Sequence, residues 1–153
     1  MTASDQTVVG ARYAGFWRRL AAMLIDVVVV NAMTLAIGFG LGLVVALTTS
    51  PETANRLFGG PTSAVAGALI AWLYFALMET SPRRATLGKL AMGLAVSRAD
   101  GTPLSFGRAT VRHFGKFVSL LPLLGGFVLA AFTRRKQALH DLFADALVIQ
   151  RGG

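Results

Sequence analysis

The sequence predicts an all-α membrane protein with two transmembrane helices, a third apolar stretch broken by proline and glycine, and a small cytoplasmic β-cap. Three observations lead to this fold class: composition, two long apolar runs, and basic residues at their ends. The 153 residues are 54% hydrophobic and 14% charged, with mean hydropathy +0.61. A soluble domain carries about 25% charged residues, so this chain has too few to cover a globule. The length predicts a single domain over residues 1–153.

The two transmembrane helices are predicted from the apolar runs at residues 20–47 and 62–78. A helix needs about 20 mostly apolar residues to cross a bilayer. The first run is interrupted only by Asp26 and Asn31 among strongly polar residues, and the second contains no charge. The first is also much longer than the apolar part of a signal peptide, about 7–15 residues, so we expect an uncleaved span. Two prolines and a Gly-Gly pair predict a loop between the runs.

The third apolar stretch, residues 114–132, has two interpretations. Lys116 lies near its start, and Pro122, Gly125 and Gly126 lie near its middle, where they weaken a helix. It forms either a third span or a hairpin that enters the membrane and returns. Cytoplasmic flanks collect Lys and Arg, and the loop between the first two runs has only Arg56. The charges on the other flanks favour the hairpin, with both termini in the cytoplasm.

A small β-cap is predicted between the second and third apolar stretches. Asp100 and Gly101 form a strong turn pair. Residues 94–97 and 102–106 on either side are candidate strands, and residues 146–150 near the end of the chain could pair alongside them as a third.

Several function classes are excluded or disfavoured. The chain has no cysteine, so a disulfide framework, a thiol nucleophile and a cysteine metal site are excluded. The formal charge is +8, but the basic residues flank apolar runs, which disfavours a nucleic-acid partner. His113 and His140 are the two histidines, and no metal-ligand spacing surrounds them. We therefore expect no metal, no cofactor and no enzyme activity.

Arg19 and Asp26 are the most informative charged pair. They are seven residues apart, almost two helical turns, so they share one face of the first predicted span. An acid inside an apolar run is costly and usually faces the protein interior, a partner or water. Asp26 lies about 10 Å along the axis from Arg19, so a third group is expected between them. Asp26 either ties two helices together through a buried ion pair or lines an ion or proton pathway.

A second group of charged residues lies near the end of the chain, at His140, Asp141 and Asp145. On a helix the two aspartates are four residues apart, where like charges repel unless a cation lies between them. Arg134 and Arg135 are close in sequence and could supply that cation. For Asp145 alone we expect only a charged interfacial segment.

We expect Asp141 to be held by an arginine at the cytoplasmic face of the membrane. A guanidinium can bind a carboxylate through two hydrogen bonds. Arg19 is the first candidate, because its helix should begin at that face, and Arg112 and Arg135 are the alternatives. Without such a clamp, Asp141 would cap a helix by accepting bonds from the backbone of residues 142–144.

The segments GFWRRLAAMLID, METS, TLGKLAMGLAVSRADGTPLS and ALHDLFADALVI occur in this order, and together they resemble the RDD family of bacterial membrane proteins. That family is named for one arginine and two aspartates. By resemblance these residues are Arg19, Asp26 and Asp141 here. The resemblance extends over residues 12–150. It differs after Asp141, where the family often has a small residue, Gly and Thr, whereas residues 144–146 here are Ala-Asp-Ala.

The resemblance implies a bacterial cytoplasmic membrane protein with a suggested role in transport of unidentified ligands. Our leading hypothesis is a transport-related protein that moves an ion, proton or small ligand through an oligomer. The alternative is a non-catalytic accessory or assembly subunit of a larger membrane complex. Expected partners are a bilayer with anionic headgroups and either further copies of the chain or other membrane subunits. Beyond the three family residues, the candidate charged network includes Glu79, Lys89, His140 and Asp145.

Overall fold

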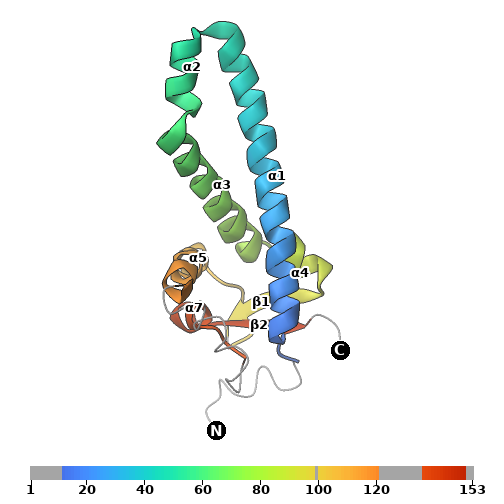
Figure 1. Ribbon diagram of the computed structural model, residues 1–153. Helices are drawn as coiled ribbons and strands as arrows, with labels where there is room; N and C mark the ends of the chain where they lie inside the picture. The colour runs from blue at the N-terminus through green and yellow to red at the C-terminus, as the bar shows by residue number, and fades with distance from the viewer. Residues whose placement is uncertain (1–11, 99, 121–135, 151–153) are drawn as a thin grey trace.

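The computed structural model describes residues 12–98, 100–120 and 136–150. Along the chain, the helices and strands of these residues follow in this order (Figure 1): α1 (Phe16–Thr48), α2 (Pro51–Phe58), α3 (Gly60–Thr80), α4 (Leu87–Ala91), β1 (Leu94–Arg98), α5 (Phe106–Leu120), α7 (Leu139–Phe143) and β2 (Ala146–Gln150). The chain is therefore mostly helical with one small sheet, as predicted.

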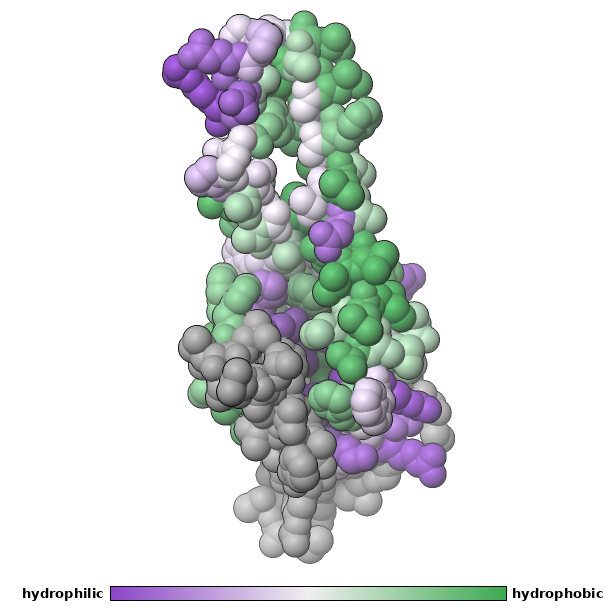
Figure 2. Space-filling view, in the orientation of Figure 1, coloured by the Kyte–Doolittle hydropathy of each residue, from purple (hydrophilic) through white to green (hydrophobic). Residues whose placement is uncertain are grey.

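The helices α1 and α3 are long and apolar enough to cross a membrane. They extend the predicted runs by one to four residues at each end. At 1.5 Å per residue, the 33 residues of α1 measure about 50 Å, which exceeds the hydrocarbon core of about 30 Å. On the face shown in Figure 2, hydrophobic residues cover most of α1, and α3 also exposes apolar side chains such as Val65, Leu69 and Leu77. The described part of the chain thus contains two candidate spans, and α1 is long enough to extend beyond the bilayer.

The connection between α1 and α3 contains a helix, α2, where the sequence predicted only a loop. Ser50 is its N-cap and accepts a hydrogen bond from the Thr53 backbone N–H, and Pro51 occupies the first turn. Proline is favoured at this position because its ring fixes a helical φ and no N–H is needed there. The predicted loop was wrong because a proline that directly follows an N-cap serine starts a helix and does not break it.

The sheet has two strands, β1 and β2, which pair antiparallel with Val96 opposite Val148. The predicted strands at 94–97 and 146–150 are confirmed, but 102–106 is not a strand. Residue 103 is proline, which has no N–H for a ladder, and α5 begins at residue 106. The Arg98 N–H donates to the Thr102 carbonyl and closes the turn. The predicted hairpin is therefore limited to this turn, and no second strand follows it at residues 102–106.

Residues 12–14, just before α1, lie beside β2. Tyr13 forms a bridge with Ile149, the Ala14 N–H donates to the Val148 carbonyl, and the Gln150 N–H donates to the Arg12 carbonyl. Residues 12–14 and 148–150 consequently lie side by side. The two ends of the described chain meet at the same end of the long helices.

The core lies at this end, beneath the start of α1. Leu94 and Val96 of β1, Val148 of β2 and Leu104 of the turn form one buried apolar cluster. The helix α5 packs against both α3 and α7. It includes the beginning of the predicted third apolar stretch, whose residues 121–135 lie outside the described part of the chain.

Candidate functional site: a buried charged cluster

Three basic and three acidic side chains gather where α1 and α3 meet α4, α5 and α7. We call them the charged cluster, and its members are Arg19, Asp26, Glu79, Lys89, Arg112 and Asp141. Asp26, Glu79 and Asp141 are at most 1% exposed. An isolated buried charge is very costly, so the hydrogen bonds and ion pairs of these groups determine whether the cluster is stable.

Asp26 ties α1 to α3 and α4 through neutral donors. Its Oδ1 accepts from the Tyr74 hydroxyl and from the Gly88 backbone N–H, both at 2.8 Å, and its Oδ2 accepts from the Thr86 hydroxyl at 2.6 Å. Among the described residues, no basic side chain lies within ion-pair distance of this carboxylate. Of the predicted alternatives, Asp26 faces the protein interior, and within the described residues it ties helices together through hydrogen bonds from neutral groups rather than through an ion pair.

The segment Thr86-Leu87-Gly88 has the local features needed to approach Asp26. Thr86 is the N-cap of α4 and accepts from the Lys89 N–H, while its own hydroxyl hydrogen reaches Asp26. Gly88 contacts α1 directly: a Cβ added there would lie 2.1 Å from the Ala22 carbonyl oxygen. Any larger residue at position 88 would therefore push α4 away from α1.

Arg112 is the centre of the remaining ion pairs. Its Nη1 binds Glu79 at the end of α3, while its Nε and Nη2 each lie 2.7 Å from Oδ1 of Asp141 in α7. Lys89 of α4 forms a second ion pair with Glu79. One guanidinium from α5 thus joins α3 to α7, because its fork can bind two carboxylates at once.

Arg19 also binds Asp141, as predicted. Its Nη1 pairs with Oδ2 of Asp141, and its Nε donates to the Ala14 carbonyl at 3.1 Å. Asp141 additionally accepts from the Ala138 backbone N–H. The contact is confirmed, but the predicted two-bond clamp from Arg19 is wrong. The guanidinium divides its bonds between Asp141 and Ala14, and Arg112 supplies two nitrogens to Asp141 instead.

The electrostatics of Asp141 follow from this arrangement. Burial would raise the pKa of its carboxyl group, but the positive charges of Arg112 and Arg19 outweigh burial and hold the pKa well below its usual range. In turn, burial lowers the pKa of Arg112, and the negative charges of Asp141 and Glu79 more than reverse that effect. Asp141 and Arg112 therefore remain ionised at neutral pH.

The two histidines beside the cluster are neutral. Burial lowers the pKa of His140 to about 3, although its Nε2 lies 3.5 Å from Oδ1 of Asp141. Burial and the charge of Lys116 lower the pKa of His113 to about 4. Both imidazoles would have to gain charge in a buried site to take up a proton.

Asp145 lies apart from the cluster. Its carboxylate is about half exposed and lies 3.3 Å from Arg108 and 3.6 Å from Arg98. Its φ of 49° places it in the left-handed region, where aspartate is tolerated better than most residues. The residue is thus charged and partly exposed, and its expected place at the membrane interface stays a prediction. The predicted cation source, residues 134 and 135, lies outside the described part of the chain.

The structure unites most of the predicted network. Arg19, Glu79, Lys89 and Asp141 belong to one chain of ion pairs, and Asp26 lies beside them. Sequence reasoning missed the donors to Asp26, which are Tyr74, Thr86 and Gly88, and the bridging role of Arg112. The glycine after an N-cap threonine was a usable signal for close helix approach; nothing in the sequence pointed to Tyr74.

The chemistry available to the cluster is binding and holding of charge. Within the described ranges, no group of three histidine, aspartate or glutamate side chains is placed to hold a metal ion. Each carboxylate of the cluster already accepts hydrogen bonds from groups of the same chain. The arrangement joins five helices at one end of two apolar spans, which defines a small helical membrane protein held together by buried charge.

The comparisons with known proteins agree with this class. The RDD family model matches residues 13–145, so the chain belongs to the RDD family. It is 30% identical over 149 residues to "Uncharacterized protein YxaI" of Bacillus subtilis (strain 168), covering 90% of this chain and 97% of that one. It is 32% identical over 139 residues to "Uncharacterized membrane protein YteJ" of the same organism, covering 90% and 80%. No solved structure matches the chain.

The family match, the relative named as a membrane protein and the two apolar helices agree that this is an RDD-family membrane protein. The resemblance stated from the sequence is thereby confirmed. The family arginine and aspartates assigned there, Arg19, Asp26 and Asp141, all lie in the buried charged cluster.

Proposed function

We propose that this protein is a non-catalytic accessory or assembly subunit of a larger membrane complex. The observation that supports this role is that the three carboxylates of the charged cluster are satisfied by groups of the same chain. Asp26 accepts three hydrogen bonds, Glu79 pairs with two cations, and Asp141 pairs with Arg19 and Arg112. Groups held in this way stabilise a fixed arrangement of helices and are poorly suited to exchange ions repeatedly.

The partners in this proposal are other membrane subunits that contact α1 and α3. Side chains such as Leu35, Phe39 and Leu47 of α1 and Val65 of α3 are more than half exposed. Two helices from one chain do not enclose a pathway, so any channel would require further helices. These apolar faces contact lipid in the free subunit and other helices in the assembled complex.

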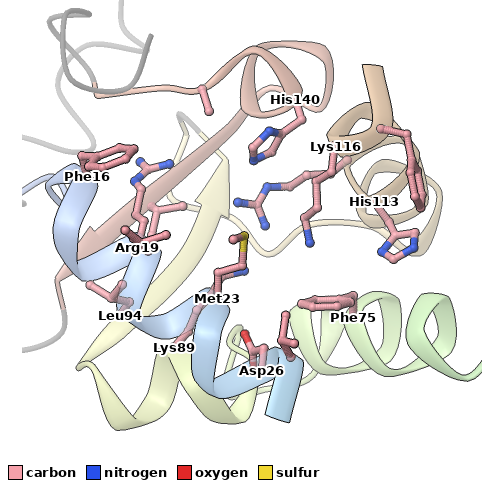
Figure 3. A pocket seen from close by; sticks show the side chains of 16 residues that line it. Phe16, Arg19, Met23, Asp26, Phe75, Lys89, Leu94, His113, Lys116 and His140 are labelled. Atoms are coloured by element: carbon pink, nitrogen blue, oxygen red, sulfur yellow. The ribbon is translucent and has the colours of Figure 1, made fainter. Parts of the chain in front are cut away.

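A second candidate, transport of an ion, proton or small ligand through an oligomer, is favoured by one observation. Asp26 lies on the wall of a cavity of about 470 Å³ between the long helices and α5 (Figure 3). A carboxylate beside a cavity at this depth is a common element of ion and proton pathways. The three donors on Asp26 weigh against it, because each would have to be displaced.

Purification from native membranes after mild cross-linking tests the two functions. The accessory role predicts unrelated membrane subunits in fixed stoichiometry with the tagged full-length chain. A discrete homo-oligomer that contains no other protein would contradict it and support transport. The comparison sample is a tagged membrane protein of similar size and abundance, which identifies proteins that bind the matrix or the detergent micelle.

Two substitutions of Asp26 separate the roles further. Asp26→Asn keeps an oxygen that can accept from Tyr74 and Gly88, whereas Asp26→Ala removes all three bonds. A structural role predicts near-normal abundance and assembly for Asp26→Asn and reduced abundance for Asp26→Ala. An abundant, assembled Asp26→Asn protein that has lost the cellular phenotype of the wild type would instead support transport.

We further propose that both termini face the cytoplasm and that the chain crosses the cell membrane an even number of times. Tyr13 pairs with Ile149, and α5 packs against α7, which requires residues 12–14 and 136–150 to share one side. Arg56 lies at the opposite end, in α2. Reporter fusions before residue 12 and after residue 153 should both be active only inside the cell. Activity of either fusion outside would refute this topology.

A further inference from the structure

The cavity beside the charged cluster has an apolar wall that faces the membrane-spanning helices. Phe16, Leu20 and Met23 contribute from α1, Phe75 from α3 and Phe117 from α5 (Figure 3). Its volume of about 470 Å³ lies within the range of about 300–1,000 Å³ that is common for ligand sites. Walls of this kind accept a hydrocarbon chain or an aromatic group.

The charges that line the same cavity are mainly positive. Its lining includes one acid, Asp26, and four basic residues, Arg19, Lys89, Arg112 and Lys116. Three of these cations are paired with Glu79 or Asp141. Lys116 makes no ion pair with a described carboxylate, and its ammonium lies 3.7 Å from the centre of the Phe75 ring. Burial lowers the pKa of Lys116 to about 7, so an anion bound beside its ammonium would raise that pKa again and hold the lysine in its charged form.

Two further polar atoms on the lining residues lack partners. Nη2 of Arg19 and Nδ1 of His113 are buried and make no hydrogen bond within the described part of the chain. His113 is 7% exposed. A buried donor without an acceptor is costly, and Arg19 Nη2 can only donate. The missing group is thus an acceptor, and the charge of Arg19 and Lys116 favours an anionic one.

We propose that this cavity binds an acidic phospholipid from the surrounding bilayer, with its phosphate at Lys116 and an acyl chain along the aromatic wall. Basic pockets between transmembrane helices recognise anionic headgroups in this way. The observations behind this proposal, the apolar wall, the position of Lys116 and the missing acceptor, do not depend on the accessory role.

The sequence of residues 121–135, which lie outside the described part of the chain, does not match the needs of this cavity. That segment is apolar, but its charged residues are Arg134 and Arg135. It would add positive charge beside Lys116 and would supply no carboxylate for Arg19. An acidic lipid supplies an anion for Lys116 and a hydrocarbon chain for the apolar wall.

The test is lipid selectivity of the intact protein in nanodiscs that contain equal amounts of phosphatidylglycerol and phosphatidylcholine. Native mass spectrometry gives the ratio of the two lipids retained by the folded chain. We expect wild-type protein to enrich phosphatidylglycerol, and Lys116→Gln to reduce the enrichment about fivefold, the value of one basic residue near an acidic lipid surface. Lys116→Arg should retain it.

Lys136→Gln is the matched control, because Lys136 is exposed and does not line the cavity. It should enrich phosphatidylglycerol as the wild type does. Equal losses in Lys116→Gln and Lys136→Gln would mean a general attraction of a +8 chain and would overturn the site. Wild-type protein without enrichment would overturn it as well.

A competition experiment with inorganic phosphate distinguishes a bound lipid from a bound free anion. Excess inorganic phosphate should not displace the retained phosphatidylglycerol, because it cannot occupy the apolar wall. Complete displacement would assign the cavity to a free anion and refute the lipid. Persistence of selectivity in Lys116→Gln, measured on the folded protein, would refute the role of Lys116.

Discussion

Replacing Arg112 with alanine tests whether the charged cluster holds the helices together. The side chain is 3% exposed and binds Glu79 and Asp141, which are themselves fully buried. Removing one partner of a buried ion pair costs about 3–5 kcal/mol. Each carboxylate keeps one other cation, Lys89 or Arg19, so we expect the lower end, about 3 kcal/mol of unfolding free energy. For a chain of this size that corresponds to a loss of about 6–12 °C in Tm.

The assay is thermal unfolding of the purified full-length protein in one mild detergent. Arg108→Ala is the matched control, because Arg108 lies one turn earlier on α5 and pairs with the half-exposed Asp145. An exposed pair contributes about 0–1 kcal/mol, so the control should unfold close to the wild type. Arg112→Lys should recover only part of the loss, since one ammonium cannot bind both carboxylates with the fork of a guanidinium.

The reasoning is refuted if Arg112→Ala unfolds within the range of Arg108→Ala. That result would mean that Lys89 and Arg19 are sufficient to stabilise the buried carboxylates of Glu79 and Asp141 when Arg112 is absent. Equal stability of Arg112→Lys and wild type would refute the bridging role while leaving the need for a positive charge intact.

Three further predictions follow from the same contacts. Gly88→Ala should lower abundance in membranes, measured by quantitative immunoblot, whereas Gly38→Ala on the open face of α1 should not, because an added Cβ meets nothing there. Arg19→Lys should be intermediate in Tm between wild type and Arg19→Ala, since a lysine can replace one of its two bonds; a Tm as low as that of Arg19→Ala would contradict this. The free energy of unfolding should fall as the pH falls from about 6.5 toward 4. In the folded chain the pKa of His140 is about 3 and that of His113 about 4, whereas the usual value is about 6.5. Between these values the unfolded chain binds more protons than the folded chain, so protonation favours unfolding. Replacing both histidines with glutamine should flatten the Tm profile over this window, and an unchanged slope would exclude them as its cause.

One prediction from the sequence changes with the structure. Arg19 and Asp26 share a helix face, and a direct ion pair between them would mean that Arg19→Ala/Asp26→Ala recovers part of the stability lost in Asp26→Ala. The structure places Arg19 on Asp141 and Asp26 on Tyr74, Thr86 and Gly88. We now expect the losses of the two single variants to add, with no recovery in the double variant, as measured by Tm against both single variants.

The two spans, the paired strands and the burial of Asp26 were determined by the sequence itself. A run of about 20 apolar residues has few alternatives to a membrane helix, and an acid inside such a run must find partners. The pairing of Arg19 with Asp141 was also predictable, because both were expected at the same membrane face. These features depend on local composition and on length.

The partners of Asp26, the bridge made by Arg112 and the cavity beside them were decided only by the tertiary structure. Tyr74 and Thr86 reach Asp26 from 48 and 60 residues away, and no periodicity along the chain links these positions. Arg112 was one of several arginines near the third apolar stretch, and its selection depends on how α5 packs against α3 and α7. Side chains distant in sequence meet only after the helices have packed, so their pairing is a property of the folded chain.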